Sequence, residues 1–137
     1  MENGNGEAFN HLGGHYAHGR YGLPQDYQKA SGLYRRAGEL GCAEAYFNLG
    51  ICYRQGQGRG VEVDTKAKHC FELAAAMGGD MFARYNLGCM EGRAGNHERA
   101  YKHYILSAKG GYKGSLEFVK KGFTKGFVTK DEYASTL

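Results

Sequence analysis

The sequence predicts an all-α fold built from stacked helical hairpins. The first observation is a recurring Leu-Gly pair, which begins at residues 12, 49 and 87 and so returns after 37 and then 38 residues. The second is the helical spacing of apolar residues around each pair, at intervals of three and four. Glycine-containing loops separate these segments. Helix, loop and helix at a fixed period of about 30–40 residues are typical of an α-solenoid.

The first hairpin is expected over residues 7–42. Its first helix covers residues 7–18, and a loop that contains Pro24 follows it. Asp26 is well placed to cap a second helix over residues 27–39, because its carboxylate can accept from the free amides of the first turn.

The second hairpin is expected over residues 43–80. Its first helix, at about 43–55, carries Gly50 in mid-helix, where glycine costs ~1 kcal/mol relative to alanine. We therefore expect Gly50 to mark a close contact with another helix. Gly56, Gly58 and Gly60 are expected to end this helix, and the second helix is expected from about Asp64 to Met77.

The third hairpin is expected over residues 81–112, with a first helix at 81–93 and a second that holds Tyr104. Residues 113–137 are expected to cap the array. Thr129 and Glu132 form a capping box that opens a last short helix to Leu137. Residues 1–137 are thus predicted to form a single repeat array.

The residues around Ala45–Gly58 also resemble a known family. The spacing Ala-x3-Leu-Gly-x2-Tyr-x2-Gly-x-Gly, followed by a helix that ends in Ala-Ala-x2-Gly, resembles the Sel-one-like repeat (SLR), a relative of the tetratricopeptide repeat. The resemblance covers about residues 7–122, although Glu91 replaces the motif tyrosine and Lys120 replaces the motif glycine. It implies a right-handed α/α superhelix (solenoid) of three helix-hairpin repeats plus a C-terminal capping helix or hairpin.

Composition narrows the class of function. The net charge of +4, from 18 basic and 14 acidic residues, is well below the clustered charge of a nucleic-acid-binding domain. No apolar run reaches the ~20 residues of a membrane span, and the polar N-terminus predicts neither a secretory signal nor a transit peptide. The four cysteines lack metal-site spacing and are expected to be free thiols in a reducing compartment, the cytoplasm. A disulfide between Cys52 and Cys70, across a helical hairpin, is kept as an alternative.

Three patterns that suggest chemistry are weighed against simpler roles. His11, His15 and His18 have chelating spacing, but no further ligand lies nearby in the sequence, so structural or surface histidines are favoured. The glycine-rich run 56–60 lacks the preceding strand and the Gly-Lys-Ser/Thr ending of a phosphate loop. A nucleophilic Cys52 or Cys89 would need a placed base. No catalytic residue, cofactor or metal site is predicted.

The resemblance implies that ligands bind in a concave groove lined by the first helix of each hairpin. Asparagines there can hydrogen-bond a peptide backbone, arginines can pair with an acidic group, and aromatic residues can anchor apolar side chains. Alternatively, asparagine before Leu-Gly is common in this family and serves helix packing. The candidate partner-binding residues are Asn10, His11, Phe47, Asn48, Ile51, Arg54, Phe82, Tyr85, Asn86, Cys89, Arg93, Phe118 and Lys121.

The predicted function is therefore a non-enzymatic protein–protein interaction or scaffold module. Its expected partner is a protein or a peptide of acidic and hydrophobic character, and neither nucleic acid nor a membrane is expected. An array that serves only as a spacer or an assembly element stays open. The alternative is an enzyme, a hydrolase of the cysteine-rich repeat type linked to β-lactam binding. It is disfavoured because the paired cysteine of each repeat and a Ser-x-x-Lys motif are absent.

Overall fold

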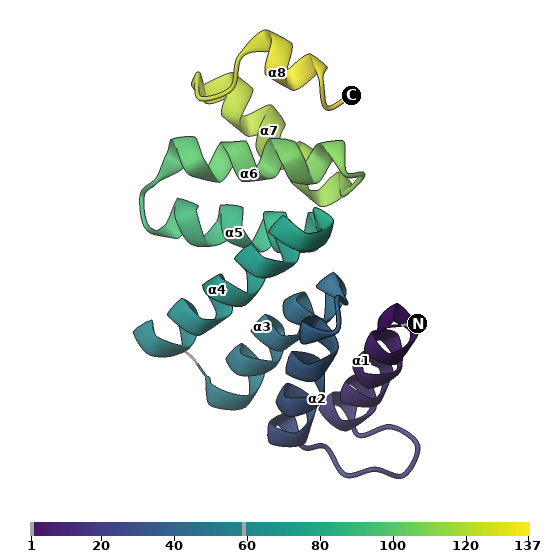
Figure 1. Cartoon of the computed structure of the whole chain (residues 1–137). Coiled ribbons are helices and arrows are strands. Elements are labelled where there is room, and N and C mark those ends of the chain that lie inside the picture. Colours follow the sequence, from purple (N-terminus) through teal and green to yellow (C-terminus); the bar gives the residue numbers. More distant parts are fainter. Residues whose placement is uncertain (1, 59) are drawn as a thin grey trace. The chain divides into compact units, whose positions relative to one another are not determined.

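The computed structural model describes residues 2–58 and 60–137, without the side chains of Glu2 and Asn3, and all the regular structure in these residues is helical. Eight helices follow one another along this part of the chain (Figure 1). They are α1 (Glu2–His18), α2 (Tyr27–Glu39), α3 (Ala43–Gln57), α4 (Val61–Gly78), α5 (Met81–Arg93), α6 (His97–Lys109), α7 (Lys113–Lys125) and α8 (Lys130–Ala134). The predicted all-α class of repeated hairpins is confirmed.

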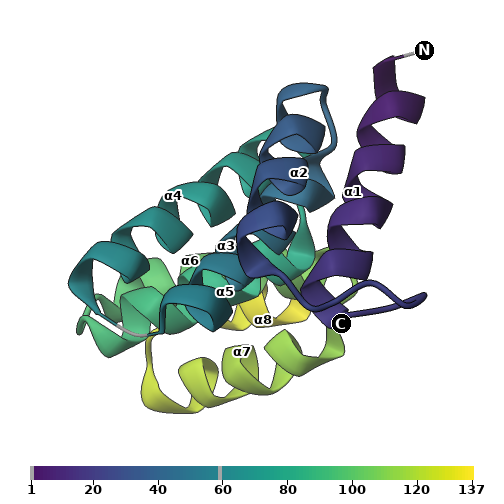
Figure 2. The same ribbon diagram turned by 90° about the horizontal axis from the view of Figure 1, so that it is seen from below.

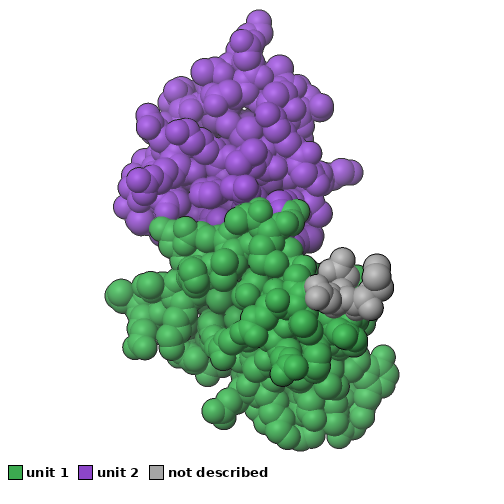
Figure 3. Space-filling view, in the orientation of Figure 1, with its two compact units in different colours: residues 1–78 green, residues 79–137 purple. Residues whose placement is uncertain are grey.

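The chain divides into two compact units (Figure 3). Unit 1 comprises residues 1–78 with α1–α4, and unit 2 comprises residues 79–137 with α5–α8. Within each unit every helix packs on the next helix in the sequence (Figures 1 and 2). The single continuous array over 1–137 stays a prediction. None of the described helices is both long enough and apolar enough to cross a bilayer.

The mid-helix glycines of the Leu-Gly pairs each receive an aromatic ring from the second helix of the same hairpin. A Cβ atom on Gly50 would lie 2.6 Å from Cε1 of Phe71, closer than real Cβ atoms approach. The same arrangement places Tyr34 on Gly13 at 2.8 Å and Tyr104 on Gly88 at 2.7 Å. The expected close contact at Gly50 is thus present, and it is made by a buried ring.

Each unit buries its own core beneath these contacts. In unit 1 the core joins four helices through Ala17, Tyr34, Leu49, Cys52 and Cys70, and Phe71 is fully buried beside them. In unit 2 it joins Ala100, Tyr104, Ile105, Val119 and Val128. Because each helix is apolar on more than one side, its burial depends on the neighbouring helices.

Side-chain hydrogen bonds cap the first turn of three helices, α2, α5 and α8. The Asp26 carboxylate accepts from the Lys29 amide at 3.0 Å and begins α2 as predicted. Asp80 begins α5 in the same way, and Thr129 and Glu132 form the predicted capping box of α8. Helix α8 ends at Ala134 rather than at Leu137.

Three further helix boundaries differ from the prediction. Helix α1 begins at Glu2 and not at residue 7, because Gly6 is buried and its missing side chain lets the first turns lie against Leu40 and Cys42. Helix α4 begins at Val61 rather than at Asp64, and Asp64 lies inside it in an ion pair with Arg54. Gly56 lies inside α3 rather than ending it.

The end of α3 shows why this last prediction failed. Gly56 is a second close-contact glycine, because a Cβ there would lie 2.9 Å from Cβ of Tyr27. Gly58 follows α3 with φ of +78°, a backbone conformation that favours glycine. A glycine-rich run therefore contains both a packing position and a helix end.

Glu91, which replaces the motif tyrosine, is buried and holds a tight loop. Its side chain is 4% exposed, and Oε2 accepts from Nδ2 of Asn96 at 2.9 Å. The backbone N–H of Asn96 also donates to the backbone carbonyl of Glu91 at 2.9 Å. These contacts fasten the connection between α5 and α6.

We expect Gly50→Ala to lower the free energy of unfolding by about 1–3 kcal/mol, because the new methyl group overpacks the buried Phe71 ring. The effect opposes the gain in helix propensity. Chemical denaturation measures the change.

The control is Gly32→Ala in α2, where a Cβ would meet nothing within 4 Å. That substitution should raise stability by about 0.5–1 kcal/mol. If Gly50→Ala were as stabilising as Gly32→Ala, the packing role of Gly50 would be refuted.

Candidate functional site

In unit 2 the surface at α5, the first helix of its hairpin, carries a connected set of aromatic rings. We call the surface at the first helix of a hairpin the first-helix face. Tyr85 lies at the centre of the set, with ring centroids 5.0 Å from Tyr112 and 5.8 Å from Phe118. Phe82 contacts Tyr112 at 5.1 Å, and Tyr104 stacks on Phe118 at 4.6 Å with an interplanar angle of 13°. We call these five residues the aromatic cluster. Phe82 is 42% exposed, so the cluster presents an apolar edge to solvent.

Polar and cationic groups surround the aromatic cluster. The Tyr104 hydroxyl donates to Sγ of Cys89 at 3.4 Å, and Nζ of Lys121 lies 5.5 Å from the Phe118 ring centroid. Burial raises the pKa of Tyr85, whereas the nearby charge of Arg93 lowers it. Five of the predicted residues, Phe82, Tyr85, Cys89, Phe118 and Lys121, therefore meet in one place, with Arg93 close by. This face can hold an apolar side chain next to an anionic group.

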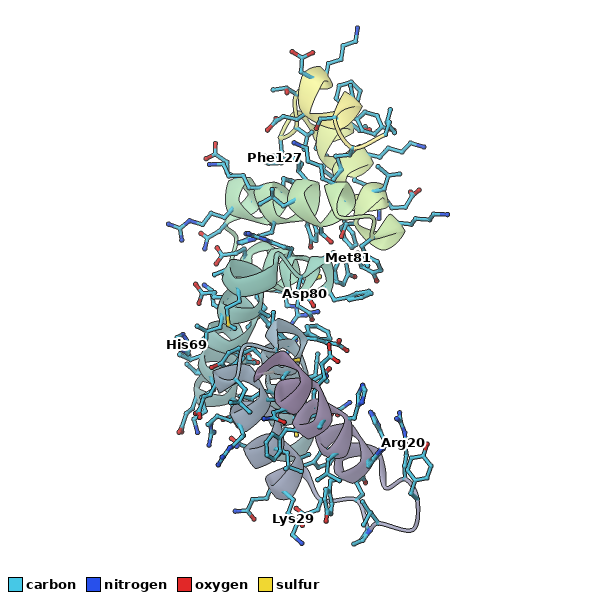
Figure 4. All side chains as sticks on the ribbon, turned by 45° about the vertical axis from the view of Figure 1, so that its right-hand side comes forward. Arg20, Lys29, His69, Asp80, Met81 and Phe127 are labelled. Atoms are coloured by element: carbon cyan, nitrogen blue, oxygen red, sulfur yellow. The ribbon has the colours of Figure 1, made fainter. Side chains whose placement is uncertain are left out.

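The first-helix face of unit 1 is different, because it holds a polar cavity of about 240 Å³. Among the predicted residues it brings together Asn10, His11 and Asn48. Its other lining residues are Gly14, His15, His18, Arg20, Tyr34 and Glu44. Arg20 extends from the loop that follows α1 (Figure 4).

The predicted asparagines make contacts within the fold. Nδ2 of Asn48 donates to Oδ1 of Asn10 at 3.0 Å, which joins α3 to α1, and Asn10 is only 6% exposed. Nδ2 of Asn86 donates to the Phe82 carbonyl of its own helix at 2.8 Å. The Asn10–Asn48 pair therefore has the packing role that was the alternative, and ligand binding by Asn48 and Asn86 stays a prediction.

Arg54, Phe47 and Ile51 complete the predicted set in unit 1. Nε of Arg54 lies 3.8 Å from Oδ1 of Asp64 on α4, and the Arg54 side chain is 13% exposed. Phe47 packs beside Phe71 with ring centroids 5.7 Å apart, and Ile51 is half-buried. Arg54 therefore joins the two helices of the second hairpin, and its pairing with an acidic ligand stays a prediction.

In the part of the chain that the structure describes, Cys52, Cys70 and the histidine row lack the surroundings of a nucleophile or a metal site. Burial raises the pKa of the Cys52 thiol and raises that of Cys70 to about 11, the opposite of what a nucleophile needs. The histidine row lines the polar cavity, yet the described residues contain no group of three or more His, Cys, Asp or Glu side chains suited to a metal ion. In the glycine-rich run 56–60, Arg59 lies outside the described residues.

Sequence reasoning missed several residues of these surfaces. Tyr112 lies in the short connection before α7, outside the helical pattern, and Tyr104 was assigned only to packing. Tyr112 follows Gly110-Gly111, and an aromatic residue directly after such a loop was the available signal. Tyr34, Arg20 and Glu44 come from three different segments, so no local motif links them.

A family comparison and a solved structure agree on one family. The Sel1 repeat family matches residues 7–42, 43–79 and 82–112. The chain is similar to a Sel1 repeat protein from Oxalobacter formigenes of known crystal structure, with a TM-score of 0.76 and 27% identity over 94% of this chain and 55% of that chain. It is also 42% identical over 50 residues to an uncharacterized protein of Neisseria meningitidis. That match spans 36% of this chain and 11% of the relative.

Alkaline pH should destabilise unit 1 through Tyr34. Burial raises the pKa of this hydroxyl from 10.0 to about 12, while the unfolded chain keeps the ordinary value. The stabilising contribution is complete below pH 10 and is lost as the pH rises through about 12. Relative to Tyr34→Phe, the wild type should lose on the order of 2–3 kcal/mol across this range.

Denaturation of both proteins from pH 8 to pH 12 gives this difference directly. The other tyrosines and cysteines titrate in both proteins, so their contributions to the free energy of unfolding cancel in the difference. A difference that stays constant up to pH 12 would contradict the burial of a protonated Tyr34 hydroxyl.

Proposed function

The chain belongs to the Sel1 repeat family, and we propose that it is a non-enzymatic module that binds a peptide or a partner protein through its first-helix faces. Sel1 repeat proteins are generally protein–protein interaction modules and are typically non-catalytic scaffolds. The chain spans about half of the similar crystal structure and about a ninth of the Neisseria meningitidis relative, so the activity and partners of those whole proteins do not carry over to it.

The aromatic cluster of unit 2 is the observation that carries this proposal. Binding interfaces favour aromatic anchors that are held rigidly and partly exposed. Tyr104 and Phe118 stack on each other and both contact the Tyr85 ring, while Phe82 stays accessible at the edge. A ligand side chain that covers Phe82 would bury apolar area without first ordering the cluster.

The proposed ligand is an acidic and hydrophobic peptide segment. Lys121 and the exposed Arg93 border the cluster and supply positive charge. An anionic group next to an apolar side chain would satisfy both features, and binding should weaken as salt screens the charges. The reducing compartment stays part of the proposal and rests on the spacing of the four cysteines in the sequence.

A selection from a displayed library of random dodecapeptides tests the function. We expect the selected peptides to combine Asp or Glu with aromatic or aliphatic residues. Phe82→Ala should weaken their binding about tenfold, while the melting temperature changes little because Phe82 is at the surface.

The matched control is Phe123→Ala in α7, since Phe123 is 40% exposed and contacts Tyr133 instead of the cluster. This control should bind the selected peptides as the wild type does. Peptides that bind Phe82→Ala normally and lose affinity for Phe123→Ala would place the ligand elsewhere and refute the assignment of the aromatic cluster.

A further inference from the structure

Unit 1 contains a groove along its second helices that is separate from both first-helix faces. A cavity of about 500 Å³ lies among α2, the C-terminal half of α3 and the start of α4. A second cavity of about 360 Å³ continues along the same three helices. Arg35, Tyr53 and Lys66 line both cavities, and we call the combined feature the α2–α4 groove.

Two permanent cations converge on one tyrosine at the middle of this groove. Nη2 of Arg35 donates to the Tyr53 hydroxyl, and Nζ of Lys66 lies 5.9 Å from the centroid of the Tyr53 ring. The two cations come from different helices, α2 and α4, and the α3 tyrosine lies between them. This arrangement concentrates positive charge at the junction of the two cavities.

Among the residues that the structure describes, no carboxylate lines the larger cavity to neutralise these cations. The described residues in the wall of that cavity are neutral apart from Arg35 and Lys66. Lys66 has an ion pair with Glu62 at 3.6 Å, but the Glu62 side chain is 85% exposed and an exposed pair of this kind contributes little. The charge of the larger cavity is therefore complementary to an acidic group.

The remaining walls fit a peptide chain. Gln28 and Gln57 line the larger cavity, and each can both donate to and accept from a peptide backbone. Gly32 has open space where a Cβ would be, so a ligand backbone can approach α2 closely. The smaller cavity adds the apolar side chains of Leu49 and Leu73.

The remaining wall residues of the smaller cavity indicate where an acidic group of the ligand can bind. Glu39 is the one acidic side chain among the described residues of its wall, and His69 lies on α4 (Figure 4). An acidic ligand group is therefore favoured at the Arg35–Lys66 junction rather than beside Glu39. An apolar side chain fits the section with Leu49 and Leu73.

We infer that the α2–α4 groove is a second binding site, which takes a peptide segment that carries a carboxylate side chain followed by an aliphatic one. The carboxylate lies between Arg35 and Lys66, where the planar guanidinium can form two hydrogen bonds with it. The aliphatic side chain enters the smaller cavity. This site is independent of the proposed ligand of the aromatic cluster.

The probe is a blocked octapeptide of alternating Glu and Leu, compared with the same peptide with Gln for Glu. Amide NMR titration of the full chain should show the largest shifts at Gly32, Gly56 and Lys66, with the Gln peptide bound at least tenfold more weakly. Shifts confined to α5 and α7, or equal binding of the two peptides, would overturn the inference.

Matched variants separate this site from general charge attraction. Arg35→Gln with Lys66→Gln should weaken the Glu-Leu peptide at least tenfold, whereas Arg36→Gln with Lys29→Gln should change it less than twofold. Arg36 and Lys29 are exposed on the same α2 helix, where they lie over the rings of Phe9 and Tyr16 and line neither cavity. The two double variants have the same net charge, so an equal loss in both would refute the site.

Phe82→Ala distinguishes the two proposals. It should leave the binding of the Glu-Leu probe unchanged, and Arg35→Gln with Lys66→Gln should leave dodecapeptides selected on the aromatic cluster unchanged. If Phe82→Ala alone abolished binding of the Glu-Leu probe, the α2–α4 groove would be rejected as a binding site. The function proposed for the aromatic cluster would stand.

Discussion

The contact between a helix glycine and an aromatic ring of the paired helix is the constraint on which each hairpin depends. At Gly50 the ring of Phe71 occupies the space in which any other residue would place a Cβ, and Phe71 is fully buried there. The glycine lowers local helix propensity by ~1 kcal/mol, and the buried ring offsets that loss through apolar burial and close packing. Because the pattern recurs in three hairpins, it explains why the Leu-Gly pair is the most regular feature of the sequence.

The candidate binding surfaces are extensions of this packing contact. Tyr104 closes on Gly88 and, with the same ring, stacks on Phe118 at the base of the aromatic cluster. The Tyr34 ring packs against Gly13 and forms part of the wall of the polar cavity in unit 1. A residue that completes the hairpin therefore also shapes the surface offered to a ligand.

Helix positions were predictable because they depend on local periodicity, caps and glycine. Asp26 and Thr129 act as predicted, since a capping interaction spans only three residues. The contacts of Asn48 and Arg54 were not predictable, because their partners lie on other helices. A periodic pattern predicts which face of a helix is apolar, but it does not identify the residue across from it.

The same limit explains why the candidate site was predicted only in part. Phe82, Tyr85 and Phe118 were expected on the first-helix face and do come together. Tyr112 was missed because it lies in a connection between helices. The α2–α4 groove was missed because its cations belong to two separate helices and become neighbours only when the hairpins pack.

A double-mutant cycle between Gly50 and Phe71 tests the central claim most directly. It compares the free energies of unfolding of the wild type, Gly50→Ala, Phe71→Leu and the double variant. We predict a coupling of at least about 1 kcal/mol, because the added methyl group at residue 50 clashes only when the Phe71 ring is present. Additive effects, with Gly50→Ala equally costly beside Leu at residue 71, would contradict the account.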